Sequence, residues 1–403
     1  MSVVERTLVA IVGAGPAGLL LSQLLHRHGI ESVIVEARSR EYCEARVRAG
    51  VIEQDGRDTL IEAGVGERMT REGLIHSGIH LRFDGESHHI AMSELTGGRT
   101  VTIYGQTEVT KDLITARLAS GGPLRFDCED VRVDGLEADA PVVRYRHHGV
   151  AYELRAEFVA GCDGFHGVCR PTIPSGLLKV WERVYPFAWL GILADVAPST
   201  DELIYARHDR GFALHSMRST SVSRLYLQVS PDEELTGWSD DRVWEELSIR
   251  LATDGWELTP GPVSEKSITP MRSFVAAPMR YRNLLLAGDA AHIVPPTGAK
   301  GLNLAIADVS VLAEALIDRL DRGSSSGLDE YSDRCLRRVW RAQHFSWWMT
   351  KMLHLDPDDD EYGRELARSQ LRYVCSSTAA ATSLAENYVG LPATQLSGTV
   401  AGG

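Results

Sequence analysis

The chain has 403 residues, of which 44% are hydrophobic and 24% charged, and this composition excludes a largely disordered protein. Its formal net charge of −13 argues against nucleic acid and anionic membrane surfaces as partners. The six cysteines include no CxxC pair and are too sparse for a disulfide scaffold. They favour reduced thiols in a cytoplasmic protein.

The first apolar segment, residues 7–25, looks at first like the start of an export signal. Three glycines and a proline interrupt it, and His26, Arg27 and His28 follow in place of a cleavage site. We therefore interpret it as a strand, a turn and a helix. No other stretch approaches 18 uninterrupted apolar residues, so no transmembrane helix is expected.

The N-terminal elements predict a β-α-β unit. Residues 8–12 are wholly apolar, as in a strand buried on both faces of a parallel sheet. Residues 19–28 have helical spacing that stops at Gly29, and residues 32–35 form a second apolar run. The two strands should therefore be parallel, with a right-handed crossover between them.

The turn of this unit, Gly13-Ala14-Gly15-Pro16-Ala17-Gly18, fits the dinucleotide-binding pattern GxGxxG. Gly13 permits the tight turn, Gly15 lets the backbone approach a pyrophosphate, and Gly18 lets helix and strand pack closely. Glu36 ends the second strand, 36 − 18 = 18 residues beyond Gly18. A carboxylate there accepts hydrogen bonds from a ribose 2′-OH and repels a 2′-phosphate, which favours FAD or NAD over NADP.

The rest of the chain divides into strands and then helices. Alternating segments near 203–205, 211–215 and 225–229 predict a mostly antiparallel sheet over about 180–275. The apolar run 284–287 is expected to return to the first domain. Helical patterns follow at 303–320, at 328–353 and from about 361, and the tail after residue 392 is expected to fray.

Three further segments favour FAD over NAD. They are 160–164, which follows a strand pattern, 284–292, which contains Gly288-Asp289, and 295–303, where a glycine-rich turn meets a helix N-terminus. Together they resemble the FAD-binding signatures of the class A flavoprotein aromatic hydroxylases. Within that class, segments 104–109, 218–219, 346–350 and 385–392 resemble the 4-hydroxybenzoate 3-monooxygenase family, and the likeness runs from about residue 7 to 392.

This resemblance implies an α/β fold in which a Rossmann-like FAD-binding domain is interleaved with a mostly antiparallel β-sheet substrate domain and followed by C-terminal helices. It also implies a homodimer. The expected boundaries are 1–180 and 276–320 for the FAD-binding domain (with residues of about 70–105 inserted from the substrate domain), 181–275 for the substrate domain, 321–392 for the helical region and 393–403 for a flexible tail.

The implied activity is hydroxylation of 4-hydroxybenzoate to 3,4-dihydroxybenzoate with FAD, NAD(P)H and O2, through a flavin hydroperoxide. By the resemblance, Arg218 binds the substrate carboxylate, a role that suits a bidentate guanidinium, and Ser216 and Tyr226 add donors. Leu203, Trp189, Leu214 and Val51 are expected to line the apolar remainder. From the residues alone, a surface salt bridge stays open as the alternative for Arg218.

The resemblance further implies a proton relay from the substrate phenol, whose unperturbed pKa is about 10. Tyr205 would contact the phenol oxygen, Tyr388 would pass the proton on, and His76 would form the solvent end, while the Pro296 carbonyl lies near the phenolic oxygen. Core packing stays open as the alternative for both tyrosines and for His76.

Cofactor positions are also carried over from the family. FAD is expected at Gly13, Gly15, Ala17, Gly18, Glu36, Arg46, Arg48, Gln106, Asp163, Arg224, Asp289, Leu302 and Asn303, and NAD(P)H at Tyr42, Arg46, His166, Arg170 and Arg272. Two departures stand out. Ala37 replaces the basic residue expected in NADPH-preferring members, which leaves NADPH and NADH both open. His215 and Met217 also differ from the expected neighbours of Ser216, and we expect both side chains to face away from the pocket.

Three alternatives remain at this point. The same chemistry could act on a related hydroxy- or aminobenzoate. A plain NAD-dependent dehydrogenase would be colourless when purified, whereas bound FAD would make the protein yellow. A non-catalytic flavin-binding module would be yellow but would oxidise NAD(P)H at a rate indifferent to any phenol.

Overall fold

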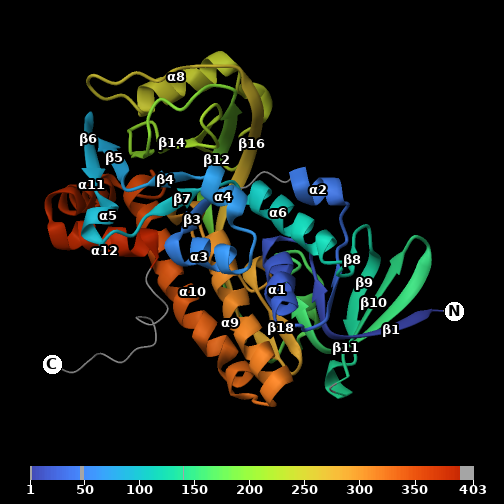
Figure 1. The fold of residues 1–403 in the computed structure, drawn as a ribbon. Coiled ribbons are helices and arrows are strands. Elements are labelled where there is room, and N and C mark those ends of the chain that lie inside the picture. Colours follow the sequence, from blue (N-terminus) through green and yellow to red (C-terminus); the bar gives the residue numbers. More distant parts are fainter. Residues whose placement is uncertain (1, 46–49, 139, 391–403) are drawn as a thin grey trace, which may run out of the picture.

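The computed structural model describes residues 2–45, 50–138 and 140–390. Arg46, Arg48 and the tail 393–403, all singled out from the sequence, lie outside this described part. Within it, strands and helices form two large sheets, one small sheet and a helical C-terminal region (Figure 1). No helix of the described residues is long and apolar enough to cross a membrane.

The first sheet contains the N-terminal β-α-β unit. Its strands lie in the order β17 (Arg280–Tyr281), β18 (Leu284–Leu286), β11 (Val150–Gly161), β1 (Val3–Val12), β2 (Ser32–Val35) and β8 (Leu124–Arg125), with β10 (Val142–His147) beside β11 and β9 (Glu129–Asp134) beside β10. The pairs from β18 to β8 are parallel, as the apolar runs predict. The apolar run 284–287 was expected to return to the first domain, and β18 confirms this by pairing with β11.

Helices on this sheet enclose the first core. They are α1 (Pro16–Arg27), α6 (Gln106–Ala119) and α9 (Gly301–Arg322). Their apolar side chains join the buried strands in one cluster that includes Ile11, Leu21, Leu113 and Ile306. This cluster fixes the carboxyl ends of β1 and β2, where the glycine turn and Glu36 lie.

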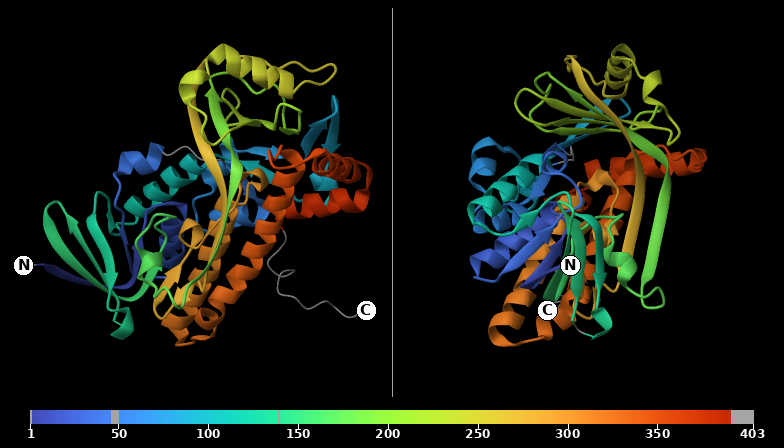
Figure 2. Two further views of the ribbon diagram at one scale, coloured as in Figure 1. Left: turned by 180° about the vertical axis from the view of Figure 1, so that it is seen from behind. Right: turned by 90° about the vertical axis from the view of Figure 1, so that its right-hand side faces the viewer.

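The second sheet is mostly antiparallel. Its order is β19 (His292–Ile293), β16 (Val263–Ala277), β12 (Lys179–Ala194), β15 (Ser223–Val229), β14 (Ala213–Met217), β13 (Leu203–Ala206), β5 (Ile79–Phe83) and β6 (Glu86–Ile90). Only the β13–β5 pair is parallel. Helix α8 (Asp240–Arg250) covers one face of this sheet, and Figure 2 shows the long β12 and β16 running from it toward the first sheet.

A small third sheet and short helices connect the two. Strand β7 (Val101–Ile103) lies between β3 (Val51–Glu53) and β4 (Leu74–His76). The short helices are α2 (Arg40–Ala45), α3 (Gln54–Glu62), α4 (Glu67–Glu72), α5 (Met92–Leu95) and α7 (Cys169–Thr172), with 3-10 turns η1 (Leu136–Ala138), η2 (Leu235–Gly237), η3 (Gly288–Ala290) and η4 (Pro296–Gly298).

The C-terminal region is helical, but the helix expected from about residue 361 is two helices. After α10 (Ser326–Leu353) come α11 (Glu361–Ser376) and α12 (Thr378–Val389). Ser377 separates them with an extended backbone, and its hydroxyl accepts a hydrogen bond from the Ala380 amide. A serine in this conformation ends one helix and caps the next.

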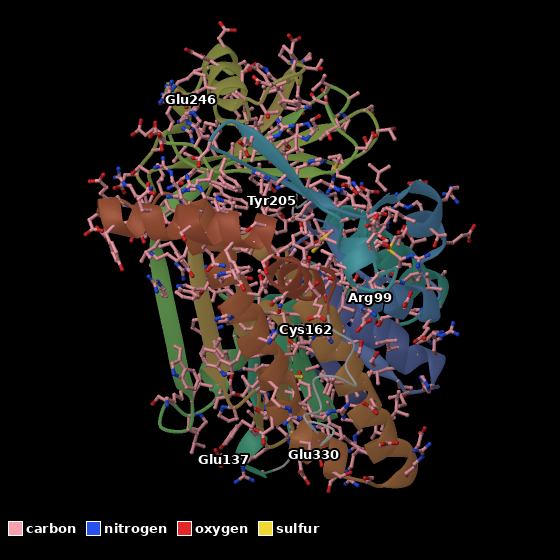
Figure 3. All side chains as sticks on the ribbon, turned by 90° about the vertical axis from the view of Figure 1, so that its left-hand side faces the viewer. Arg99, Glu137, Cys162, Tyr205, Glu246 and Glu330 are labelled. Atoms are coloured by element: carbon pink, nitrogen blue, oxygen red, sulfur yellow. The ribbon has the colours of Figure 1, made fainter. Side chains whose placement is uncertain are left out.

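Helix α12 packs against the second sheet. Leu384 and Tyr388 on this helix belong to the same buried cluster as Tyr205 on β13 and Trp189 on β12. Figure 3 shows Tyr205 in the interior, between this sheet and the C-terminal helices. The second core therefore surrounds residues that the sequence singled out for substrate binding.

Candidate active site

The glycine turn after β1 has the shape that a pyrophosphate site requires. A Cβ on Gly13, whose φ is 107°, would lie 2.3 Å from the Cys162 carbonyl oxygen, and one on Gly18 would lie 2.1 Å from that of Gly13. A Cβ on Gly15 would meet nothing within 4 Å. Gly13 and Gly18 are thus needed for the fold, whereas Gly15 leaves space beside the uncapped N-terminus of α1.

Carboxylates follow the two parallel strands that flank β1, on either side of this turn. Glu36, after β2, accepts hydrogen bonds from the amides of Ala14 (2.6 Å) and Arg38 (2.8 Å). Asp163, after β11, accepts one from the Cys169 amide at 2.8 Å, but its Oδ1 is buried and has no partner. Burial raises the pKa of Asp163. An unpartnered buried oxygen indicates a missing donor, which a hydroxyl-rich ligand would supply.

The N-terminus of α9 faces the same region. Asp289 lies exposed after β18, and the following segment turns through Ala299, with φ at 53°, into α9 at Gly301. The first amide groups of a helix have no partner within it and are available to an anion or a polarised ring oxygen. The Asn303 side chain itself is committed, because its Nδ2 donates to the carbonyls of Val51 and Ala299 at 2.9 Å each.

These features fit FAD. The turn has room for a pyrophosphate at Gly15, Glu36 lies where a ribose hydroxyl is expected, and Asp163 offers an unused acceptor. Ala17 and Leu302 are buried in their helices, and Gln106 begins α6 and is half-buried.

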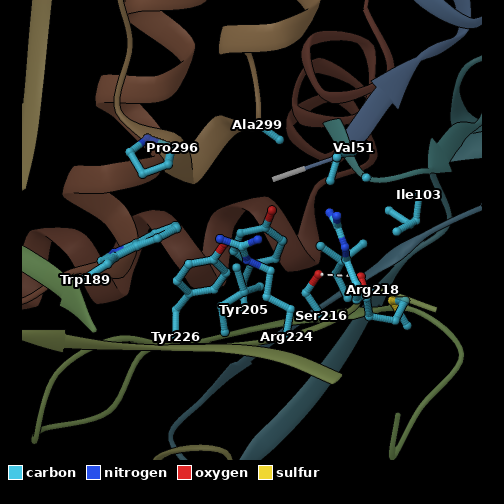
Figure 4. Close-up of a pocket in the computed structure, with 15 residues that line it drawn as sticks. Val51, Ile103, Trp189, Tyr205, Ser216, Arg218, Arg224, Tyr226, Pro296 and Ala299 are labelled. Carbon is cyan, nitrogen blue, oxygen red and sulfur yellow. Dashed lines mark hydrogen bonds between the residues drawn. The ribbon is translucent and has the colours of Figure 1, made fainter. Parts of the chain in front are cut away.

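A cavity of about 480 Å³, counting its mouth, lies between the second sheet and the Pro296–Ala299 turn (Figure 4). Tyr205, Leu214, Tyr226 and Gly191 are aligned across four adjacent strands, so their side chains share one face. Because Gly191 has no side chain, the Tyr226 ring can lie over it. The remaining lining residues are Gly50, Val51, Ile103, Gly105, Trp189, Leu203, Ser216, Met217, Arg218, Arg224, Pro296 and Ala299.

Two arginines, Arg218 and Arg224, line this cavity. The guanidinium of Arg218 packs against Gly105, where a Cβ would lie 2.1 Å from its Nη1. Burial, with a contribution from the Arg224 charge, lowers the pKa of Arg218. The Arg224 guanidinium lies 5.1 Å from the centroid of the Tyr226 ring and has a buried, unpartnered Nη1. Two partly buried cations in one cavity suit an anionic ligand.

Tyr205 lines the cavity and is paired with a second tyrosine, Tyr388 on α12. The hydroxyl oxygens of Tyr205 and Tyr388 are 2.6 Å apart, and both residues are buried. Burial raises the pKa of each hydroxyl, so both tyrosines are neutral near pH 7. A chain of hydroxyls can move a proton without either residue becoming charged for long, and this pair links the cavity to α12.

Comparison with known proteins agrees with this geometry. The family model described as "FAD binding domain" matches residues 6–346. The chain is 52% identical over 388 residues to p-hydroxybenzoate hydroxylase of Acinetobacter baylyi, and the alignment covers 96% of both chains.

This chain belongs to the p-hydroxybenzoate hydroxylase family of FAD-binding proteins. A more distant relative is the probable NADH-specific resorcinol 4-hydroxylase of Rhodococcus jostii, 28% identical over 80% of this chain and 61% of that protein. Among solved structures, p-nitrophenol 4-monooxygenase from Pseudomonas putida superposes with a TM-score of 0.81 at 20% identity, covering 97% of this chain and all of that one. At that identity, the likeness establishes the fold.

His76, which the family resemblance places at the solvent end of a relay, is buried in this structure. The residue is 1% exposed, and both ring nitrogens are buried without a partner. Burial lowers its pKa to about 4. His76 is buried because it lies on β4, which pairs with β7 inside the small sheet.

Met217 also differs from expectation. It lines the cavity with Ser216, although we expected it to face away. His215 does face away: its Nε2 accepts a hydrogen bond from the Ser199 amide at 3.1 Å, and its ring packs edge-on against Trp256. All five residues of β14 are buried. An alternation of polar and apolar residues therefore could not show which of these side chains face the cavity.

The described residues expected for NAD(P)H in this family come from α2, α7, β16 and the loop before α7. Tyr42 is exposed on α2, beneath the guanidinium of Arg38. Arg170 and Arg272 stack on the Phe165 ring, next to the exposed His166. The Arg170 guanidinium donates to the carbonyls of Phe165 and Ala290, so part of its role is to hold the loop itself.

The sequence analysis missed a buried ion pair behind the tyrosines. Lys300 Nζ lies 2.7 Å from Glu53 Oε1 and donates to the Tyr388 carbonyl at 2.9 Å. Lys300 lies within the glycine-rich segment 295–303, which was the one signal for it. No pattern in the sequence marks Glu53.

Proposed function

We propose that this protein hydroxylates 4-hydroxybenzoate at its 3-position, giving 3,4-dihydroxybenzoate with NAD(P)H and O2 as co-substrates. One observation carries the proposal: a single cavity is lined by two arginines, Arg218 and Arg224, and by Tyr205, whose hydroxyl oxygen lies 2.6 Å from that of Tyr388. A small ring with a carboxylate and a phenol opposite each other is complementary to that arrangement. The name of the Acinetobacter relative supports the same substrate.

Each end of the cavity has a distinct role in this proposal. Arg218 binds the substrate carboxylate through charge-assisted hydrogen bonds, and Ser216 and Tyr226 supply further donors. Tyr205 accepts the phenolic proton as its own hydroxyl proton passes to Tyr388, which in turn gives up its proton. In this proposal the relay ends at His76, whose ring nitrogens have no partner among the described residues and pass the proton to solvent. Loss of the phenol proton makes the ring more electron-rich, which an electrophilic oxygen atom requires. The Pro296 carbonyl borders the same cavity.

FAD, when bound, supplies the redox and oxygen chemistry of this reaction. The glycine turn, Glu36, Asp163 and the N-terminus of α9 would hold it in this proposal. Arg224 lines the cavity, and its positive charge would favour an anionic reduced ring. The apolar walls around Trp189 and Leu203 keep water from the reacting atoms.

The coenzyme preference, location and assembly are also proposals. The protein uses NADPH or NADH, because Ala37 lies where a basic residue would favour the former. Six free cysteines and a net charge of −13 support a cytoplasmic enzyme without nucleic acid or membrane partners.

A homodimer is supported by an apolar surface on β12 and α10. The ring centroids of Trp181 and Trp340 are 5.2 Å apart, and Val184 is 63% exposed. Exposed apolar side chains of this size are candidates for an interface. Analytical ultracentrifugation of the wild type and Val184→Glu tests this: the wild type should sediment as a dimer and the variant as a monomer.

A substrate panel tests the proposed activity. NADPH and NADH oxidation should be stimulated most by 4-hydroxybenzoate, with less stimulation by 4-aminobenzoate and by 2,4-dihydroxybenzoate, and little by benzoate, which has no phenol. Faster and better-coupled turnover with one of the other rings would replace the proposed substrate with that ring. A yellow protein whose NAD(P)H oxidation ignores all four would refute catalysis on aromatic acids of this size.

A further inference from the structure

Three side chains of metal-ligating type meet outside the cavity, where the β5–β6 hairpin joins the start of β13. Among residues 2–45, 50–138 and 140–390, His80, His89 and Glu202 form the one group of three or more His, Cys, Asp or Glu residues whose ligand atoms all lie within 4.8 Å of one another. Nothing in the proposed hydroxylation uses this group.

The two histidines are held together by the hairpin. His80 on β5 lies directly opposite His89 on β6, so both side chains are on the same face of the sheet. Their ring centroids are 4.9 Å apart. The two-residue turn Asp84-Gly85, with φ of 52° and 80°, fixes the register of the strands and hence this pairing.

The third side chain is oriented by backbone amides. Oε1 of Glu202 accepts hydrogen bonds from the amides of Ser77 (3.0 Å) and Gly78 (2.6 Å). This leaves Oε2 directed at His89, with 2.8 Å between Oε2 and Nε2. Such outer hydrogen bonds are what orient a metal-binding carboxylate in known sites.

Gly78 leaves the space in which these groups meet. A Cβ at this position would lie 2.2 Å from His89 Nε2 and 2.9 Å from Glu202 Oε2. The glycine φ is outside the left-handed region, so backbone conformation alone does not demand glycine here. Its lack of a side chain is what lets the imidazole and the carboxylate converge.

The exposure of the cluster also suits a metal ion. The side chain of His89 is 46% exposed and that of Glu202 is 18% exposed. Water can therefore reach the group and complete a coordination sphere.

We propose that His80, His89 and Glu202 bind one divalent transition-metal ion, with zinc as the best match. Two imidazole nitrogens and one carboxylate oxygen suit zinc, whereas magnesium and calcium prefer all-oxygen sites. The ion replaces the hydrogen bond between His89 and Glu202, and small side-chain rotations bring the three ligand atoms to it. It joins the hairpin to the strand that carries Tyr205, three residues after Glu202. The role is structural and adds no redox step.

Zinc titration of the untagged, FAD-loaded protein tests this proposal. After treatment with a chelator and its removal, isothermal titration with ZnCl2 should show one site per chain. His80→Gln, His89→Gln and Glu202→Gln should each weaken binding by about tenfold or more. His88→Gln is the matched control: His88 is the neighbour of His89 on β6, but it stacks on Phe83 on the other face, and its variant should bind zinc like the wild type.

Two results would overturn the proposal. One is the absence of a saturable site in the wild type, which would leave the cluster as a hydrogen-bonded group only. The other is equal zinc affinity in all four variants, which would mean scattered binding to other histidines. If a variant fails to fold, by circular dichroism and flavin content, X-ray absorption of the zinc-loaded wild type decides instead. It should show two imidazoles at about 2.0 to 2.1 Å, and scattering without imidazole would refute the site.

Discussion

The hydroxyl oxygens of Tyr205 and Tyr388 lie 2.6 Å apart, although the residues are 183 positions apart in the chain. One comes from a strand of the second sheet and the other from the last described helix, and both are buried. Buried tyrosine rings are common, but Tyr205 also lines the cavity, and its contact with the Tyr388 hydroxyl provides a route for a proton. The proposed chemistry depends on that route.

Replacing Tyr205 by phenylalanine should uncouple the reaction. Without its hydroxyl, the substrate phenol loses its partner and stays protonated, so the ring is less reactive. We expect NAD(P)H oxidation to continue while 3,4-dihydroxybenzoate formation falls and hydrogen peroxide accounts for the difference. Product and peroxide are measured per coenzyme oxidised. Tyr331→Phe is the control, because it also removes a buried hydroxyl, bonded to the Leu286 carbonyl, but outside the cavity. Full coupling in Tyr205→Phe would remove Tyr205 from the relay.

Arg218→Ala should weaken 4-hydroxybenzoate binding strongly. The variant loses a charge-assisted interaction of about 1.5 to 3 kcal/mol, which corresponds to a dissociation constant raised roughly 10- to 150-fold. Flavin absorbance changes on titration give the constant. Arg218→Lys should recover only part of the affinity, since an ammonium lacks the bidentate fork. Arg242→Ala, on exposed α8, serves as the control. Unchanged affinity in Arg218→Ala would place the carboxylate elsewhere.

Gly15→Ala and Gly18→Ala should fail in different ways. The backbone at Gly15, with φ at −75° and ψ at 176°, accepts alanine, and its Cβ meets no protein atom, so the variant should fold. Its methyl group occupies the pyrophosphate approach, and FAD affinity should fall by about tenfold or more. Gly18→Ala meets the Gly13 carbonyl and should lower the melting temperature of the protein itself. Flavin fluorescence and thermal melts separate the two effects; normal FAD affinity in Gly15→Ala would contradict the assignment.

Buried His76 should make the protein sensitive to mild acid. Its pKa in the folded state is lowered from 6.5 to about 4, so the unfolded chain takes up the proton first as the pH falls. The free energy of unfolding should therefore be highest above about pH 6.5 and decline as the pH drops toward 4. The slope from this group is at most about 1.4 kcal/mol per pH unit.

Urea unfolding at pH 7 and pH 5 measures this slope. His76→Leu should flatten it, because the apolar replacement has no proton to gain, whereas His26→Gln at the exposed end of α1 should leave it unchanged. An identical slope in His76→Leu and the wild type would mean that water reaches His76 in the folded protein.

The sequence predicted best where local chemistry determines the structure. The β-α-β unit, the glycine turn and the acid after β2 are fixed by apolar runs and by backbone space at Gly13 and Gly18. The meeting of Tyr205 with Tyr388 followed only from family resemblance, since no periodicity relates residues so far apart. Burial on both faces of β14 hid the orientation of Met217. The Lys300–Glu53 pair depends on tertiary contacts between residues far apart in the chain. The break at Ser377 depends on a serine cap, without the glycine or proline that usually marks a helix end.

The proposed hydroxylation can be measured as the amount of 3,4-dihydroxybenzoate formed per NAD(P)H consumed when the purified yellow protein turns over 4-hydroxybenzoate. Coenzyme oxidation should depend strongly on 4-hydroxybenzoate, and the product ratio should be near one, with the product identified by chromatography and mass. Strong stimulation with mostly hydrogen peroxide would make 4-hydroxybenzoate an effector and the true substrate a related ring. No stimulation by either coenzyme would contradict the proposed activity.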